Sequence, residues 1–162
     1  MERTQQQQKQ QEPAQVSITR SYPVAPEKVW RAWTDPQALI QWFGPSRSGP
    51  VSLAEIDLCV GGRYRIAFDS SDGKPHEVSG VYQEVVPHRR LVFTWAWKRT
   101  PEQVSRVSID LVPMKHGGGK GTELRFVHDR FFDVEARDNH ELGWMPSFAK
   151  LGDFLNLDSQ KV

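Results

Sequence analysis

Hydrophobic and polar positions alternate along much of the chain between residues 16 and 127, which is the pattern of strands with one buried face. In the segment 63–69, for example, Tyr64, Ile66 and Phe68 fall on one face and charged residues on the other. Segments of this kind predict strands at residues 16–22, 51–58, 63–69, 77–86, 90–97, 104–112 and 122–127. Short connections join the later strands, so we expect neighbours to pair antiparallel.

Helical spacing replaces this alternation in two regions. Directly after the first strand, Pro26 and Pro36 each suit a first helical turn and Asp35 can cap the second, which predicts two short helices back to back. The segment from 133 to about 157 carries apolar side chains at i, i+3 and i+4 and predicts one long amphipathic helix. Because Pro146 lies inside it, we expect this helix to bend there or to begin near it.

The chain divides into a short tail and one domain. Residues 1–15 are dominated by glutamine and have too few apolar side chains to offset chain entropy, so we predict a disordered tail. Residues 16–158 are enough for a single domain with a sizeable core. The order of the predicted elements indicates an α+β fold, in which a curved antiparallel sheet forms a cup with two short helices and a long closing helix.

Charge and cysteine content limit the partners and the compartment. The net charge is +1, with 21 basic against 20 acidic residues, so we expect neither nucleic acid nor a membrane surface as a partner. The single Cys59 cannot form an internal disulfide, and the N-terminus leads into glutamines rather than an apolar signal. No apolar stretch is long enough to span a bilayer. These features favour a cytoplasmic protein.

The motifs that carry chemistry are mostly missing. The glycine-rich segment 117–122 is not a phosphate-binding loop, because Lys120 is followed by glycine and no helix comes after it. No two histidines have metal-ligand spacing, and Cys59 has no identifiable base beside it. We therefore expect no metal and no cofactor, and no hydrolase motif is found.

The aromatic content points instead to the interior. Six tryptophans and eight phenylalanines are a heavy load, and large rigid rings leave gaps more readily than small aliphatic side chains, although filling a core is their commoner use. The inward faces of the strands and helices predict these ligand-binding candidates: Trp33, Phe43, Phe68, Tyr82, Trp95, Phe126, His128, Trp144 and Phe148. Tyr82, Trp95 and His128 also carry polar groups that could orient a bound molecule.

Six short motifs, taken in order, resemble one known family; they lie at residues 24–30, 34–36, 42–45, 61–64, 80–87 and 90–95. Together they are similar to the AHSA1-like (activator of Hsp90 ATPase homologue) branch of the START/Bet v 1-type SRPBCC superfamily, over residues 16–157. The resemblance implies a helix-grip fold, with a hydrophobic cavity between the curved sheet and the C-terminal helix. The resemblance also places the chain in a superfamily that includes lipid carriers, hormone binders, polyketide cyclases and cochaperone domains. The fold alone does not indicate which of these functions the protein has.

Three functions stay open at this point. The lack of a nucleophile, metal cluster or cofactor loop favours non-catalytic binding of a small hydrophobic or amphipathic molecule in the cavity. The alternative is a polyketide cyclase or dehydratase-like enzyme in the same cavity, with His128 or Glu84 exchanging protons with the substrate. A third is a cochaperone-like protein-binding domain, and the exposed faces leave a homodimer open.

Overall fold

The computed structural model describes residues 14–44, 51–70 and 72–160, so all but the last two residues of the predicted tail at 1–15 lie outside the described residues. The strands are β1 (Val16–Tyr22), β2 (Val51–Ile56), β3 (Arg63–Asp69), β4 (Pro75–Val86), β5 (Arg90–Trp97), β6 (Ser105–His116) and β7 (Gly119–Asp129). They form one seven-stranded sheet in the order β1-β7-β6-β5-β4-β3-β2, and every neighbouring pair is antiparallel. The predicted antiparallel pairing is confirmed.

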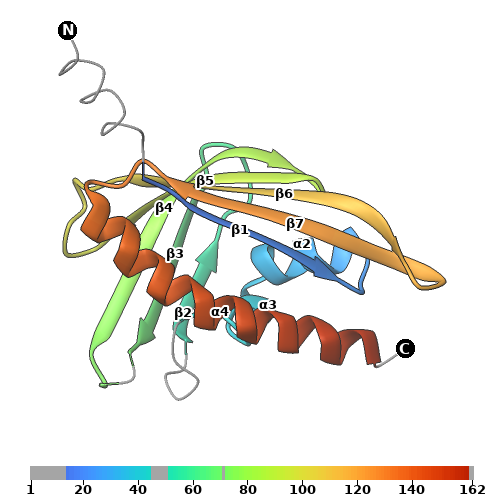
Figure 1. Cartoon of the computed structure of the whole chain (residues 1–162). Helices are drawn as coiled ribbons and strands as arrows, with labels where there is room; N and C mark the ends of the chain where they lie inside the picture. Colours follow the sequence, from blue (N-terminus) through green and yellow to red (C-terminus); the bar gives the residue numbers. More distant parts are fainter. Residues whose placement is uncertain (1–13, 45–50, 71, 161–162) are drawn as a thin grey trace, which may run out of the picture.

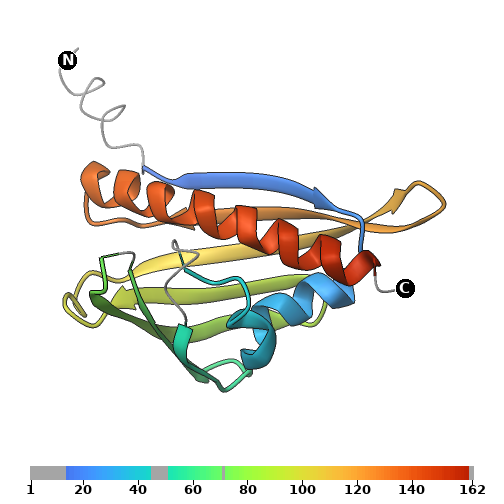
Figure 2. The ribbon, with the colours of Figure 1, turned by 90° about the horizontal axis from the view of Figure 1, so that it is seen from below.

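Three helices lie on one side of this sheet: α2 (Pro26–Thr34), α3 (Pro36–Leu39) and α4 (Val134–Gln160). The sheet curves around α4 (Figure 1), and α2 and α3 lie beside the C-terminal half of that helix (Figure 2). This is the predicted arrangement of a curved antiparallel sheet, two short helices and a long closing helix. Among the described helices, none is both long and apolar enough to cross a membrane.

The core lies between the sheet and the helices as a single cluster of buried side chains. Alternation along the strands supplies one half of it, as in β3, where Tyr64, Ile66 and Phe68 are buried between exposed or half-buried neighbours. The C-terminal part of α4 supplies Leu151 and Leu155, which are fully buried. Each such side chain contributes roughly 1.5–3 kcal/mol of hydrophobic stabilisation, so the two layers hold each other in place.

The second short helix, α3, is only four residues long. Its cap is as predicted, because Asp35 Oδ1 accepts a hydrogen bond from the Gln37 backbone N–H at 2.9 Å. The helix ends at Leu39, however, although apolar residues continue to position 43. The chain continues in turns, in which the Phe43 N–H donates to the Leu39 carbonyl at 3.0 Å. The indole N–H of Trp42 donates to the Ala32 carbonyl at 2.9 Å and ties this segment to α2.

The hairpin of β6 and β7 is longer than predicted. The sequence suggested a glycine-rich connection between residues 112 and 122, but the two strands stay paired as far as His116 opposite Gly119. Only two residues then make the turn, and Gly117 adopts φ +59°, which glycine accepts without a steric penalty. The glycines therefore make a tight reversal rather than a long loop.

Helix α4 passes through Pro146 without interruption, so it does not begin there. The helix axis curves along its length (Figure 1). Proline has no N–H to donate to the carbonyl four residues earlier, that of Leu142, and the Leu142 side chain is exposed on the outer side of the helix. Pro146 itself is exposed, so its ring lies on the solvent side of the helix and not against the sheet.

A close approach of β4 to β5 fixes the inner strands beneath α4. A Cβ atom on Gly80 would lie 1.9 Å from the Thr94 carbonyl oxygen, so only glycine fits. The Thr94 hydroxyl accepts a hydrogen bond from the Val81 N–H at 2.8 Å, and the Thr94 carbonyl accepts one from the Tyr64 hydroxyl at 2.6 Å. These bonds hold the segment of β5 that presents Trp95 to the interior.

Candidate functional site

A pocket of about 520 Å³ lies between the sheet and the N-terminal half of α4. Strands β3, β4 and β5, the turn after β5 and the segment after α3 supply one wall, and α4 supplies the other. Its lining residues are Phe43, Gly44, Phe68, Ser70, His76, Trp95, Trp97, Arg99, Thr100, Asn139, His140, Gly143, Trp144 and Ser147. This volume is in the range that small-molecule sites occupy.

Five aromatic side chains form most of the pocket wall: Phe43, Phe68, Trp95, Trp97 and Trp144. They pack against each other as well as against the open space. The ring centroids of Trp95 and Trp144 are 5.1 Å apart, and those of Phe43 and Phe68 are 5.8 Å apart in an edge-on arrangement. Aromatic pairs at these separations are mutually stabilising, so the wall is rigid as well as apolar.

Polar side chains gather where the pocket meets solvent. Arg99 and Asn139 are exposed residues of the lining, and Thr100 is half-buried. Arg99 donates from Nη2 to His76 Nδ1 at 3.0 Å, and the His76 ring stacks on Phe68 with 5.6 Å between centroids. The pocket therefore has an apolar interior and a polar opening.

His140 lies on the helix side of the pocket with both ring nitrogens occupied. Its Nδ1–H donates to the Ala136 carbonyl at 2.6 Å, and its Nε2 accepts the indole N–H of Trp97 at 2.9 Å. Because Nε2 accepts, the ring is neutral in this arrangement. Burial also lowers the pKa of His140, against a smaller opposing effect of the Ala136 hydrogen bond.

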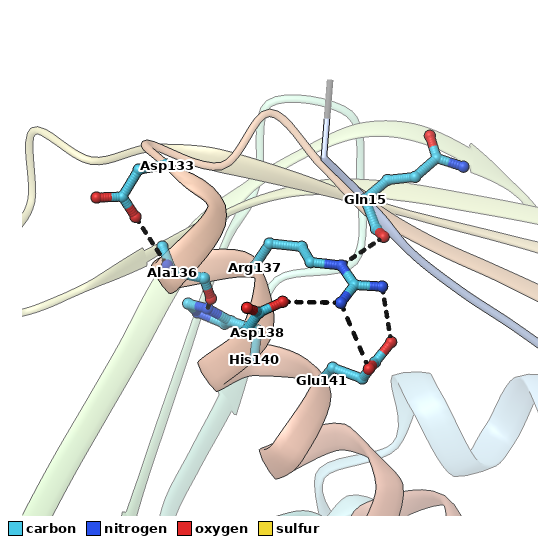
Figure 3. A network of polar contacts seen from close by, with 7 residues as sticks. All are labelled: Gln15, Asp133, Ala136, Arg137, Asp138, His140 and Glu141. Atoms are coloured by element: carbon cyan, nitrogen blue, oxygen red, sulfur yellow. Dashed lines mark hydrogen bonds and ion pairs between the residues drawn. The ribbon is translucent and has the colours of Figure 1, made fainter. Parts of the chain in front are cut away.

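Hydrogen bonds at the start of α4 hold His140 in place (Figure 3). Asp133 caps the helix by accepting the Ala136 N–H at 2.8 Å. Arg137 donates from Nε to the Gln15 carbonyl at 3.0 Å and pairs with two carboxylates of the same helix. The first turns of α4 are thus tied to the residue preceding β1, which fixes the helical wall of the pocket relative to the sheet.

His128 of β7 is completely buried and has no free nitrogen. Its Nδ1 accepts the indole N–H of Trp144 at 3.0 Å, so its proton is on Nε2, which lies 2.7 Å from the Ser105 hydroxyl. That hydroxyl in turn lies 3.2 Å from the Trp95 carbonyl, to which it donates. Burial, with a smaller effect of the neighbouring His140, holds the pKa of His128 well below its ordinary value. The imidazole is a neutral structural link.

The structure brings four of the predicted ligand-binding residues to the pocket: Phe43, Phe68, Trp95 and Trp144. Trp33 and Tyr82 instead line a separate void of about 20 Å³, deeper in the core. The other three, Phe126, His128 and Phe148, are buried outside the pocket lining. Phe126 and Phe148 pack together with 5.1 Å between ring centroids.

The two residues considered for proton exchange, His128 and Glu84, are not among the lining residues. Glu84 is exposed on β4, where its Oε2 lies 3.2 Å from Nε of Arg90. Arg90 also binds Asp110 on the neighbouring strand, so Glu84 belongs to a row of surface ion pairs. Within the described residues, no three or more histidine, cysteine, aspartate or glutamate side chains come together as a metal-binding group.

Sequence reasoning missed several pocket residues, in particular His76, Trp97 and Arg99 on the sheet side and His140, Gly143 and Ser147 on the helix side. Some of these residues could have been predicted from the spacing along their strand or helix. Trp97 follows Trp95 by two positions on one strand, so alternation places both on the same face. His140 and Ser147 are four residues before and three after Trp144, so they share its face of α4.

A seven-stranded antiparallel sheet curved around a C-terminal helix, with a pocket between the two layers, defines a protein of the helix-grip class. The family model described as Activator of Hsp90 ATPase homolog 1-like protein matches residues 23–156, so the chain belongs to that family. The family resemblance seen in the six sequence motifs is confirmed. A search of the curated proteins finds no match.

Several solved structures are similar to this chain along most of its length. Protein CV1439 from Chromobacterium violaceum is 28% identical with a TM-score of 0.76, and the match covers 88% of this chain and 96% of that one. The AHSA1 protein from Silicibacter pomeroyi is 29% identical with a TM-score of 0.73, over 90% and 99% of the two chains. A protein from Rhodobacter sphaeroides shares the fold at 24% identity, with a TM-score of 0.72 over 89% and 93%.

Proposed function

We propose that this protein binds a small hydrophobic or amphipathic molecule in the pocket between the sheet and α4. The observation that carries the proposal is an apolar hollow of about 520 Å³ walled by five aromatic rings. Ligand sites of soluble proteins have this size and this mostly apolar lining. Each Å² of apolar ligand surface removed from water contributes about 25 cal/mol, so the wall favours a ligand that covers it.

The distribution of polar groups supports an amphipathic ligand. Arg99, Thr100 and Asn139 lie where the pocket meets solvent, whereas Trp95 and Trp144 are almost completely buried. A molecule with an apolar body and one polar end would match this arrangement, because its polar end would keep hydrogen-bonding partners while its body leaves water.

Three of the titratable residues in and around the pocket support binding rather than catalysis. His128 and Glu84 do not line the pocket. His140 does, but its Nδ1–H and its Nε2 lone pair are both engaged, with Ala136 and Trp97. A general acid or base must reach the reacting proton directly or through one water, and none of these three residues is free to do so in this arrangement.

The proposal is tested with phenylnaphthylamine, a neutral aromatic probe that fluoresces strongly in apolar surroundings. The wild-type protein should bind it saturably at one site. At a probe concentration of about a hundred times the dissociation constant, mass action adds roughly 2.7 kcal/mol to the free energy of unfolding, and the melting temperature should rise. The absence of saturable binding and of any thermal shift would contradict the proposed function.

A substitution that fills the pocket tests whether the probe binds there. Gly143 lines it, and a Cβ atom built there has no heavy atom within 4 Å, so Gly143→Leu would project a side chain into open space. We expect this variant to fold and to lose probe binding. Ala149→Leu is the matched control, because Ala149 is on the exposed side of the same helix. Equal binding by both variants would mean that the probe binds elsewhere.

A further inference from the structure

The pocket lining includes one permanently charged side chain, that of Arg99. Arg99 is the only arginine, lysine, aspartate or glutamate among the described residues that line it. Its position is fixed by the turn after β5, in which the Thr100 N–H donates to the Trp97 carbonyl at 3.0 Å and the Lys98 N–H donates to the Glu77 carbonyl at 2.9 Å. The guanidinium is therefore attached to a hydrogen-bonded turn beside the aromatic wall.

The side chain of Arg99 is held by a neutral partner. Its Nη2 donates to His76 Nδ1 at 3.0 Å, and because an arginine can only donate, that imidazole nitrogen must be the acceptor. His76 is braced in turn by Phe68, at 5.6 Å between centroids, and by Trp97, at 6.1 Å. This partner orients the guanidinium without neutralising its charge, and most of its five N–H groups stay available.

Several other arginines of the protein, unlike Arg99, have carboxylate partners within the part of the chain that the structure describes. Arg65, Arg90 and Arg106 each pair with aspartate or glutamate side chains on the sheet, the last at 2.9 Å from Asp129. No carboxylate of the described residues lies within ion-pair distance of Arg99. The one cation at the pocket is thus left with an unbalanced charge, next to an apolar wall that contains no acidic group.

We propose that the pocket selects anionic ligands: flat, aromatic-rich molecules that carry a carboxylate, sulfonate or enolate group, with the anion bound to Arg99 and the rings against the tryptophans. This inference rests on the proposed function and specifies the class of ligand. A guanidinium binds planar oxyanions through two parallel hydrogen bonds, which a neutral group cannot match. The low dielectric of the aromatic wall strengthens the attraction.

A matched pair of fluorescent probes tests this selectivity. Anilinonaphthalene sulfonate and phenylnaphthylamine have the same ring system and differ by the sulfonate, so the ratio of their dissociation constants isolates the anionic group. We expect wild-type protein to bind the sulfonate at least about tenfold more tightly, the size of a single charge-assisted contact. The ratio should shrink as salt is raised, because the guanidinium lies at the solvent edge of the pocket.

Three variants test whether Arg99 causes the preference for the sulfonate. Arg99→Gln removes the charge and should lose the preference for the sulfonate while changing the affinity for the neutral probe less than about twofold. Lys98→Gln removes a charge from the neighbouring exposed residue, outside the pocket lining, and should keep the preference. Arg99→Lys keeps a charge without the planar fork and should lie between wild type and Arg99→Gln.

The outcomes separate this inference from the function on which it rests. If wild-type protein binds both probes equally, or if Arg99→Gln keeps the preference, the pocket is a binding site without anion selectivity and the inference is wrong. If neither probe binds, or if Gly143→Leu binds both as wild type does, the proposed function itself is wrong. Loss of the preference in Arg99→Gln alone, with circular dichroism unchanged, supports the inference.

Discussion

The interior contains two regions under the same curved sheet and along the same helix, one open and one sealed. Around Gly143 and Ser147, α4 leaves a pocket of about 520 Å³. Beyond Phe148, the same helix buries Leu151 and Leu155 completely, and these two residues line neither the pocket nor the smaller void. Trp144 lies at the boundary, since it lines the pocket and also packs on Phe126 at 4.7 Å between centroids.

The difference teaches that small residues at a few positions of one helix help to keep part of the interior open. Helix α4 borders the pocket with Gly143 and Ser147, and also with the larger His140 and Trp144. Farther along the helix, Leu151 and Leu155 are completely buried, and even Gly152 leaves no gap, because a Cβ atom there would meet the Tyr22 ring at 3.9 Å. Which space is filled therefore depends on the side chains of the sheet as well as on those of α4.

Two histidines at the pocket end of the interior each accept an indole N–H. His128, which is completely buried, accepts from Trp144, and His140 accepts from Trp97 at the pocket. The two imidazole rings lie 5.0 Å apart between centroids. Protonation of either ring would place a new N–H against the indole N–H that the nitrogen now accepts, so both hydrogen bonds require a neutral histidine.

The largest expected effect is in the sealed region. Phe148→Ala should lower the free energy of unfolding by about 3–5 kcal/mol, because it removes a buried ring that packs on Phe126 and Trp33 and leaves a cavity. Urea denaturation followed by circular dichroism measures this. Ser147→Ala, at the adjacent position facing the pocket, should change the free energy by less than about 0.5 kcal/mol.

This pair of variants can break the comparison. A loss below about 1 kcal/mol for Phe148→Ala would mean that its surroundings are not close-packed. The two regions would then differ less than the structure indicates, and the hollow would extend along the helix.

The next effect is a dependence of stability on pH. In the folded protein, burial lowers the pKa values of both His128 and His140, whereas in the unfolded chain both titrate near about 6.5. The unfolded state therefore binds more protons at low pH. The free energy of unfolding should be constant above about pH 7 and fall below it, by up to about 1.4 kcal/mol per pH unit for each histidine, until the lowered folded-state pKa is reached.

Urea denaturation at several pH values measures this fall, and imidazole proton shifts in NMR spectra assign it. Because burial lowers the pKa values of both residues, the signals of His128 and His140 should stay in their neutral positions below about pH 6.5. His116→Gln, at the exposed end of β6, is the control and should leave the fall unchanged. A histidine at position 128 that titrates normally would show that the buried arrangement opens readily.

Most of the fold could be predicted from the sequence because its signals are local. Alternation located every strand, and Asp35 with Pro36 marked the start of α3. The errors are at places where contacts between residues far apart in the sequence determine the local structure. The segment after α3 is tied to α2 by the bond from Trp42 to Ala32, which lies ten residues earlier. The length of the β6–β7 hairpin depends on pairing across the strands, which residue type alone does not reveal.

The site was harder, because a pocket is defined by missing volume. The sequence indicated many inward-facing rings, and it could not tell which ones pack together, as Phe126 and Phe148 do, and which border open space, as Phe68 and Trp95 do. That distinction depends on the register between α4 and the sheet. Nothing in the sequence marked Gly143 as a pocket residue, because its contribution is the open space left by its missing side chain.

The smallest effect compares two glycines of α4, one in each region. Gly143→Ala and Gly152→Ala should each stabilise the protein by up to about 1 kcal/mol, because alanine is the better helix former. A Cβ atom at Gly152 would meet the Tyr22 ring at an ordinary 3.9 Å, and one at Gly143 would meet nothing. Probe affinity should therefore weaken for Gly143→Ala only. If Gly143→Ala destabilised the protein, the space beside residue 143 would be filled in solution. An added methyl group destabilises a helix position only where it clashes with neighbouring atoms.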